Sequence, residues 1–302
     1  MYNGLLALPR QGSEPSIRLE FYGFSTPQTL WPTLAKPRTN FTGHCGGRRY
    51  SVRCAAKRIP GRPGMGVLTK QLLATGNPVV AVELDRDLCL KLRKKLGQRE
   101  NFLLLEGDVL KLDLNALLQD FSQFSPLNKV VANIPYNITS PILELLLGTI
   151  QKPRLPSFET IVLLVQKEIA ERLTAQPSTK AYGALSVRMQ YLARVDWIVD
   201  VSPKAFTPPP KVDSAVIRLT PYPVEQLPGD RRLLDQLLRL GFANRRKMLR
   251  NNLKGLIAPE QLTTLLEQLV LPSTARAEDL SLEQWLELTN LFPLFCLQSD
   301  ID

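Results

Sequence analysis

The sequence predicts an α/β fold: a mostly parallel sheet with helices on both faces, followed by a smaller all-helical part. Three observations carry this prediction. Short apolar runs alternate with helical patterns from residue 63 onward, several runs end in a polar or acidic residue, and leucines recur at helical spacing after residue 223. Strands that alternate with helices form parallel sheets, because each crossover helix packs back onto the sheet. We expect three parts, residues 1–62, 63–222 and 223–302.

The composition excludes several classes of protein. The 302 residues are 44% hydrophobic, which is enough for a sizeable core. No apolar run approaches about 18 residues, so we expect no membrane span. The four cysteines are scattered and the only histidine is His44. These features argue against a disulfide framework, a metal site and Ser-His or Cys-His catalysis, and they favour a reducing compartment, here the cytoplasm.

Residues 1–62 differ in composition and periodicity from the rest of the chain. They hold ten of the 38 Lys and Arg residues and only two acids, so most of the net charge of +10 lies there. They mix Gly, Pro, Ser and Thr with a few aromatic residues and show no periodicity beyond one turn. We expect a divergent, poorly ordered leader, or a segment that is not the native one. The alternative is a transit peptide for an organelle stroma or matrix.

The first β-α unit contains a candidate nucleoside site. Gly64 and Gly66 open a helical pattern, and an apolar run after Pro78 leads into Glu83. The spacing from the glycines to Glu83 is close to the roughly 20 residues expected between a glycine turn and the acid that binds a ribose. A carboxylate accepts both vicinal hydroxyl groups, although an acid at a strand end is often only solvated. The order of the two features favours a nucleoside pocket.

A second acid follows the next apolar run. After a charged helical pattern over 86–96, the run at 102–105 leads to Asp108 and Val109. Asp108 can accept a hydrogen bond from an adenine amino group, and its alternative role is to cap a helix.

The next apolar run, 129–132, ends in Asn133-Ile134-Pro135-Tyr136, a candidate catalytic quartet. The carboxyl ends of strands in open α/β sheets are where ligands bind. The amide oxygen of Asn133 and the carbonyl of Pro135 can accept the two hydrogens of an exocyclic amine on a flat base, while Tyr136 stacks on the ring. Acceptors placed where positive charge develops are worth roughly 10²–10³ in rate each. An ordinary turn is the alternative, since Asn and Pro are common in turns.

A proline-rich loop follows further β-α alternation. Residues 202–210 are too rich in proline for a helix or a central strand, and they contain one aromatic residue, Phe206. A stiff loop presents a side chain at low entropic cost, so Phe206 is a candidate stacking face. The alternative is a loop anchor buried in the core.

The last part of the chain carries helical patterns over 231–252, 259–269 and 280–291. In the first of these, basic residues are predicted to share one face at a spacing of four, beside an inward face of Leu249, Leu253 and Leu256. A basic stripe without acids fits phosphate contacts to structured RNA, whereas solvated charge is the usual alternative. The predicted RNA-binding residues are Arg245, Arg246, Lys247, Arg250 and Lys254.

Five motifs carry a family resemblance. They are Pro63–Thr69, Val82–Asp85, Glu106–Asp108, Asn133–Ile138 and Phe206–Ser214. In this order they resemble the ribosomal RNA adenine dimethyltransferases, specifically the small-subunit (KsgA-type) branch, over about residues 63–290. The resemblance implies a Rossmann-like class I methyltransferase fold and S-adenosyl-L-methionine as cofactor. It also implies dimethylation of the 6-amino groups of two adjacent adenosines in the 3′-terminal hairpin of small-subunit ribosomal RNA, and so a role in ribosome biogenesis.

The resemblance also assigns roles to residues. The cofactor-binding set that it implies is Gly64, Gly66, Glu83, Asp108, Val109 and Asn133. The set that handles the target base is Asn133, Pro135, Tyr136 and Phe206. Two aromatic walls make physical sense, because an extruded base loses stacking worth a few kcal/mol. The expected partners are small-subunit ribosomal RNA and a pre-30S-type particle, bound by a monomer without a metal.

Residues 60–62 depart from the family pattern. The family expects a strand and Glu-x-Gly before the glycine turn, whereas Pro60 and Arg62 stand in the positions of the acid and the glycine. If residues 1–62 are native, we expect a missing or poor central strand and weak cofactor binding. The alternative function is a catalytically impaired RNA-binding or ribosome-assembly protein on the same scaffold. A third possibility is a dimethyltransferase acting on large-subunit RNA or on DNA.

Overall fold

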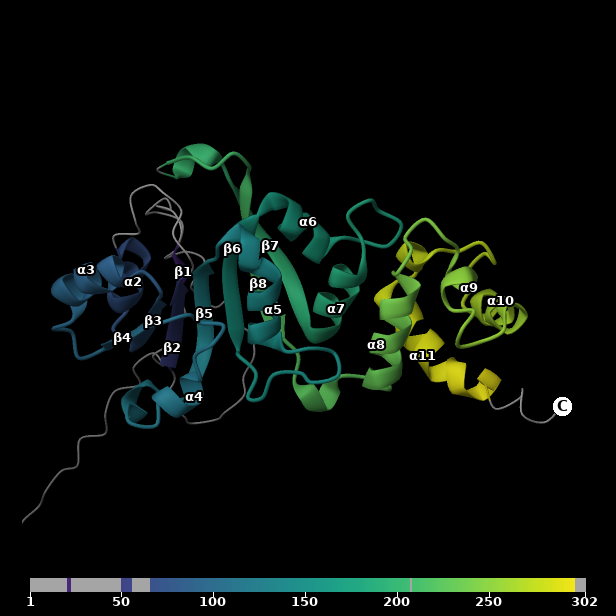
Figure 1. The fold of residues 1–302 in the computed structure, drawn as a ribbon, viewed down its shortest axis with the longest axis horizontal. Coiled ribbons are helices and arrows are strands. Elements are labelled where there is room, and N and C mark those ends of the chain that lie inside the picture. The colour runs from purple at the N-terminus through teal and green to yellow at the C-terminus, as the bar shows by residue number, and fades with distance from the viewer. Residues whose placement is uncertain (1–20, 23–49, 56–65, 207, 297–302) are drawn as a thin grey trace, which may run out of the picture.

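A computed structural model describes residues 21–22, 50–55, 66–206 and 208–296 of the chain. Its architecture is a sheet flanked by helices, with further helices beside one end (Figure 1). Gly64 and residues 60–62 lie outside the described residues. The predicted α/β class with helices after the sheet is confirmed by this arrangement.

The sheet has the strand order β4-β3-β2-β5-β6-β8-β7, with β1 beside β2. The strands are β1 (Phe21–Tyr22), β2 (Tyr50–Ala55), β3 (Val79–Glu83), β4 (Phe102–Glu106), β5 (Leu127–Asn133), β6 (Thr160–Gln166), β7 (Ala193–Val201) and β8 (Ser214–Pro221). Strands β1 to β6 pair in parallel, and β8 pairs antiparallel with both β6 and β7. The mostly parallel sheet predicted from the sequence is therefore present, with an antiparallel addition at one edge.

A strand from the first 62 residues occupies the centre of this sheet. β2 pairs with β3 on one side and with β5 on the other. We expected this central strand to be missing or poor if residues 1–62 are native. The structure fills the position with Tyr50–Ala55, whose aromatic and β-branched residues suit a pleated strand.

Helices cover both faces of the sheet (Figure 1). They are α2 (Val67–Leu73), α3 (Arg86–Leu96), α5 (Thr139–Leu147), α6 (Lys167–Thr174) and α7 (Ala184–Leu192). The short helix α4 (Leu114–Leu117) lies below the ends of the strands in the view of Figure 1. Side chains from α2 and α3 share one cluster with Val79 and Val131, whereas those from α5, α6 and α7 share another with Val80 and Val130. The side chains of successive strand residues therefore point to opposite faces of the sheet, as the pleat requires.

The remaining helices pack next to α7 at one end of the sheet. They are α8 (Arg231–Gly241), α9 (Leu249–Asn252), α10 (Pro259–Gln268) and α11 (Leu282–Cys296). Short 3₁₀ turns complete the chain at Ser122–Phe124 (η1), Tyr136–Ile138 (η2), Pro203–Ala205 (η3), Val224–Gln226 (η4) and Ala277–Asp279 (η5). The buried ring of Trp285 lies 5.7 Å from that of Phe242. One hydrophobic cluster runs from the sheet into these helices, so the division at residue 222 stays a prediction.

The predicted helix over 231–252 is wrong, because it is broken at Gly241. A Cβ at residue 241 would come within 2.7 Å of the Trp285 ring, so glycine permits this close approach. The side-chain amide of Asn252 donates to the carbonyl oxygen of Gly241 at 2.6 Å and to that of Asn244 at 3.1 Å. These bonds fold the intervening turn back onto the end of α8. The basic residues after Gly241 therefore do not share one helical face.

Two tyrosine hydroxyl groups tie the helices over the sheet to the later segments. Tyr182 donates to the carbonyl oxygen of Leu280 and Tyr191 to that of Pro228, both at 2.9 Å. Burial raises the pKa of both phenols above 10, and the nearby charge of Glu283 raises that of Tyr182 further. As pH rises, both phenols therefore lose their protons in the unfolded chain before they lose them in the folded chain.

The pKa shifts predict that stability falls in alkaline solution. Above a pH of about 10 the unfolded chain loses these protons first, so the free energy of unfolding decreases as pH rises. Tyr182→Phe should lower stability at neutral pH by about 1 kcal/mol, through the lost hydrogen bond, and should reduce the alkaline loss. Urea unfolding of both chains at neutral pH and above pH 10 measures this. An equal alkaline loss in the variant would contradict the role of Tyr182.

Candidate active site at the carboxyl edge of the sheet

The register of the sheet places Glu83 and Asn133 at the same level on one face. Ser51 of β2 pairs with Val79 of β3 and with Lys129 of β5. Four residues further on, the two neighbouring strands end in Glu83 and Asn133. Because strands lie about 4.8 Å apart, these residues are about 10 Å from each other across β2. The even spacing keeps both side chains on one face of the sheet.

Glu83 is a buried carboxylate at the end of β3. Its residue is 1% exposed, and its Oε1 accepts from the backbone N–H of Asp85 at 2.9 Å. The N–H of Gly107, just past β4, donates to the carbonyl oxygen of Glu83 at 2.8 Å. The ends of β3 and β4 are therefore fixed to each other, with a polar acceptor held at their edge.

Asp108 and Val109 follow β4 in a tight turn. Oδ1 of Asp108 accepts from the N–H of Leu110 at 3.1 Å, which closes a turn and leaves the side chain half-exposed. The alternative role of capping a helix is wrong, because Asp113 caps the next helix, α4. The side chain of Val109 is buried in the core cluster that contains Val80. Any ligand contact by Val109 would have to come from its backbone. The cofactor roles of these two residues stay predictions.

Gly66 immediately precedes α2 in a left-handed conformation, with φ at +75°. Residues with a Cβ rarely adopt this conformation, so glycine is the residue that fits the turn. Leu68 and Leu72 of α2 belong to the same cluster as Val79 of β3. The turn before α2 therefore leads onto the face of the sheet that carries Glu83.

The quartet begins at the last residue of β5 and leads into the short 3₁₀ turn η2. Asn133 is 2% exposed at the strand end, and the carbonyl oxygen of Pro135 accepts from the N–H of Ile138 at 3.2 Å. Tyr136 is half-buried, and its hydroxyl oxygen lies 2.8 Å from Oγ of Ser214. Burial raises the pKa of Tyr136, an effect that the hydrogen bond to Ser214 opposes. Tyr136 is thus a neutral ring with a fixed hydroxyl group and an accessible part.

Ser214 is a site residue to which the sequence gave no individual role. It is fully buried at the start of β8, where it pairs with Gln166 of β6. A serine at the head of an apolar run is the only local signal, because its partner Tyr136 is distant in the chain. Beside this edge lies a cavity of about 420 Å³, lined in part by Gln166, Lys167 and Asp213.

Phe206 does not present an open face. It is 2% exposed and belongs to the cluster that contains Leu164, Val201 and Val216. This burial matches the alternative role of a loop anchor. A stacking role would require the proline-rich loop to open, and it stays a prediction.

The predicted RNA-binding residues divide into two kinds. Arg246, Lys247 and Lys254 are exposed and Arg250 is half-exposed, all in or next to the turns that flank α9. Arg245 instead makes an ion pair with Glu278 and donates to two backbone carbonyl groups. Its guanidinium group is thus engaged within the protein.

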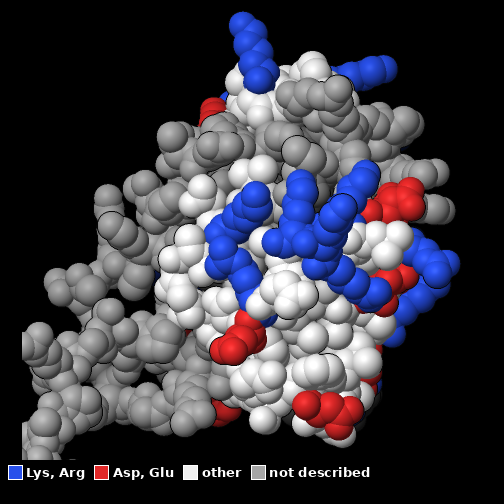
Figure 2. Space-filling view, turned by 90° about the vertical axis from the view of Figure 1, so that its left-hand side faces the viewer, with Lys and Arg blue, Asp and Glu red and all other residues white. Residues whose placement is uncertain are grey.

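Basic side chains also gather at the opposite end of the molecule, over α3 (Figure 2). They are Arg86, Lys91, Arg93, Lys94 and Lys95. Three of these lie in the last turn, where positive charge complements the helix dipole. Positive charge is therefore present at both ends of the chain's long axis and not only in the helical part.

The described part of the chain has neither a metal-binding cluster nor a membrane-spanning helix. No group of three or more His, Cys, Asp or Glu side chains is placed there to hold a metal ion. None of the helices in these ranges has the length and apolar character needed to cross a bilayer.

The chain is similar in sequence to small-subunit methyltransferases of cyanobacteria. It is 96% identical over 233 residues to the ribosomal RNA small subunit methyltransferase A of Synechocystis sp., covering 77% of this chain and 82% of that protein. It is 62% identical over 229 residues to the protein of the same name from Rippkaea orientalis, covering 76% and 84%.

Structural comparison agrees on the fold. The crystal structure of a dimethyladenosine transferase from Plasmodium falciparum superposes with a TM-score of 0.64 at 23% identity, covering 94% of this chain and 92% of that one. The family model "Ribosomal RNA adenine dimethylase" matches residues 61–293, which include every described residue of the candidate site. The chain therefore belongs to the ribosomal RNA adenine dimethylase family.

Proposed function

We propose that this protein dimethylates the 6-amino groups of two adjacent adenosines in the 3′-terminal hairpin of small-subunit ribosomal RNA, with S-adenosyl-L-methionine as methyl donor. The observation that carries the proposal is the placement of Glu83 and Asn133 at one level of one sheet face, about 10 Å apart. The names of the cyanobacterial relatives support the small subunit as the source of the RNA.

The residues at this edge fit S-adenosyl-L-methionine. A ribose needs an acceptor for two hydroxyl groups, and the buried carboxylate of Glu83 offers two oxygens. Half-exposed Asp108 suits the adenine amino group, and Gly66 leaves its turn without a side chain. When bound, the cofactor supplies a methyl group on a positively charged sulfur.

The protein's own part in the reaction is to prepare the target amine. An aromatic amino group is a weak nucleophile, because its lone pair is delocalised into the ring. The amide oxygen of Asn133 and the carbonyl oxygen of Pro135 accept its hydrogens, which favours a tetrahedral nitrogen with an available lone pair. Tyr136, oriented by Ser214, supports the ring by stacking. Because the phenol is neutral, Tyr136 adds no charge beside the reacting nitrogen.

The exposed residues Arg246, Lys247 and Lys254 and the half-exposed Arg250 contact phosphate groups of the RNA. We further propose that the protein acts as a cytoplasmic monomer, without a metal, on a pre-30S-type particle. This places its action in ribosome biogenesis.

The test is methylation of small-subunit RNA that lacks the modification, presented free and as an assembling subunit, in the presence of a chelator. Mass spectrometry should find dimethyladenosine at two neighbouring positions. Calorimetric titration should show that the folded protein binds S-adenosyl-L-methionine. Folded protein that binds no cofactor, or that methylates only large-subunit RNA or DNA, would contradict the proposal.

A further inference from the structure

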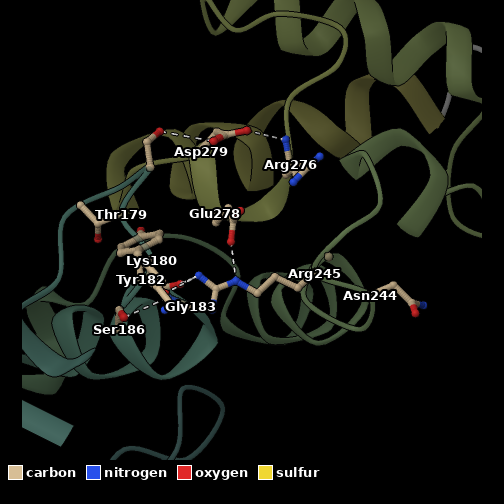
Figure 3. Close-up of polar contacts among 12 residues, drawn as sticks. Thr179, Lys180, Tyr182, Gly183, Ser186, Asn244, Arg245, Arg276, Glu278 and Asp279 are labelled. Carbon is tan, nitrogen blue, oxygen red and sulfur yellow. Dashed lines mark hydrogen bonds and ion pairs between the residues drawn. The ribbon is translucent and has the colours of Figure 1, made fainter. Parts of the chain in front are cut away.

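Arg245 lies at the centre of a set of contacts between segments far apart in the chain (Figure 3). Its Nε donates to a carboxylate oxygen of Glu278, and its Nη2 donates to the carbonyl oxygens of Lys180 at 2.7 Å and Tyr182 at 2.9 Å. The three acceptors come from two segments, the turn η5 and the loop 175–183 between α6 and α7. We call Arg245, Glu278 and these two carbonyl groups the latch.

Further bonds join the same two segments. The N–H of Ser178 donates to the carbonyl oxygen of Glu278 at 2.7 Å, and Oγ of Ser178 donates to Asp279 at 3.3 Å. The hydroxyl of Tyr182 reaches the carbonyl oxygen of Leu280. The loop is therefore already attached to η5, and Arg245 adds a third segment, the turn Ala243–Lys247.

The geometry of Arg245 suits a side chain that joins three segments of the chain. The side chain of Glu278 is 21% exposed and that of Arg245 is 49% exposed, so the ion pair is partly shielded from water. A guanidinium group has several donors in a rigid fork, which allows one side chain to bind a carboxylate and two carbonyl groups together. A lysine in this position would keep the charge but lose the fork.

The latch also lies close to the candidate active site along the chain. α6 begins at Lys167, directly after β6 ends at the carboxyl edge, and leads into the loop 175–183. Eight helical residues span only about 12 Å. The turn Ala243–Lys247, which carries exposed Arg246 and Lys247, is thus connected to the carboxyl edge of the sheet through the loop 175–183 and one short helix, α6.

We infer that Arg245 is a positioning residue that holds the basic turn Ala243–Lys247 in a fixed position relative to the candidate active site, instead of contacting RNA itself. This inference rests on the proposed RNA substrate. RNA bound by a displaced turn would present its adenosine out of line, and small misplacements of a reacting group are costly in rate.

The experiment compares Arg245→Lys and Glu278→Gln with two control variants of the full chain. Arg239→Lys makes the same exchange at an exposed position of α8, and Glu283→Gln removes the same charge from an exposed acid near Tyr182. Both latch variants should lower kcat/KM for RNA by about 3- to 30-fold. Their affinity for S-adenosyl-L-methionine should not change, and the controls should match the parent.

The two roles considered for Arg245 predict opposite effects of Glu278→Gln. A positioning role predicts that the variant acts less well on RNA, whereas a phosphate-binding role predicts that it binds RNA more tightly. A phosphate-binding Arg245 would be released by this change, so RNA affinity would rise above that of Glu283→Gln, which would overturn the inference. It would also be overturned if Arg245→Lys behaved like the parent while Arg245→Gln lowered the salt slope of RNA binding by about one. A positioning role instead predicts an unchanged salt slope in Arg245→Gln, because Arg245 contacts no phosphate.

Hydrogen exchange separates failure of the inference from failure of the proposed function. Without RNA, Arg245→Lys should speed exchange of the Ser178 N–H, which bonds to Glu278. Unchanged exchange would overturn the latch even if the parent methylates RNA. A parent chain that neither binds nor methylates RNA would contradict the proposed function, whatever the exchange result.

Discussion

Asn133→Ala is expected to lower kcat for RNA methylation by about 10²- to 10³-fold. The amide oxygen of Asn133 is one of two acceptors assigned to the target amino group, and alanine leaves no acceptor in its place. The loss should fall on kcat, because the acceptor matters most when the nitrogen becomes tetrahedral and positive charge develops on it. Single-turnover methylation with saturating cofactor and RNA measures this step directly.

The fold should tolerate the change. β5 pairs with β6 through its backbone, from Lys129 to Asn133, and these bonds do not depend on the side chain. Loss of a buried amide is expected to reduce the free energy of unfolding by about 1–3 kcal/mol. Asn115→Ala, at an exposed position of α4, is the matched control and should keep full activity. A decrease below about tenfold, or one explained by cofactor affinity alone, would remove Asn133 from its proposed role.

The order of the main elements could be predicted from sequence because the signals are local. The run Val79–Val82 is buried on both faces, and a continuous apolar segment with a polar end is typical of a central parallel strand. The same reasoning placed Glu83 and Asn133 at one edge of the sheet. It could not show that the two residues lie opposite each other across β2, because that depends on how β2 pairs with both neighbouring strands.

The break after Gly241 could not be predicted from the same patterns. Leucines at helical spacing continue on both sides of it, at Leu237 and Leu249. The turn after Gly241 is held by the side chain of Asn252, which donates to the carbonyl oxygens of Gly241 and Asn244. Gly241 itself packs against the ring of Trp285, which lies far along the chain. A contact between residues so far apart in the chain leaves no trace in local periodicity.

Arg245 and Phe206 show the same limit for site residues. Both have the chemistry that the sequence prediction required, a positive charge and an aromatic ring. The structure engages Arg245 with Glu278 and buries Phe206 beside Val201 and Val216. Residue type shows what a side chain can do, whereas its partners depend on tertiary contacts that composition and spacing do not contain.

Glu83→Gln is expected to weaken binding of S-adenosyl-L-methionine by about 10- to 100-fold. Glutamine keeps the size of the side chain and one carbonyl oxygen, so the hydrogen bond from the N–H of Asp85 can persist. It replaces the other acceptor with an amide group that donates, and it removes the charge. Hydrogen bonds to charged groups contribute about 1.5–3 kcal/mol, which corresponds to the expected range. Isothermal titration calorimetry measures the affinity.

Glu106→Gln is the matched control for this change. Glu106 pairs in register with Glu83 on the neighbouring strand, but it is exposed and lies 3.3 Å from Arg93 in a surface ion pair. Exposed pairs contribute little, so its loss should change cofactor affinity less than about twofold. RNA affinity should be unchanged in both variants, because the basic turns next to α9 are remote from β3 in the fold. Equal losses in the two variants would indicate a general effect of charge at this edge and would exclude a specific bond from Glu83 to the ribose.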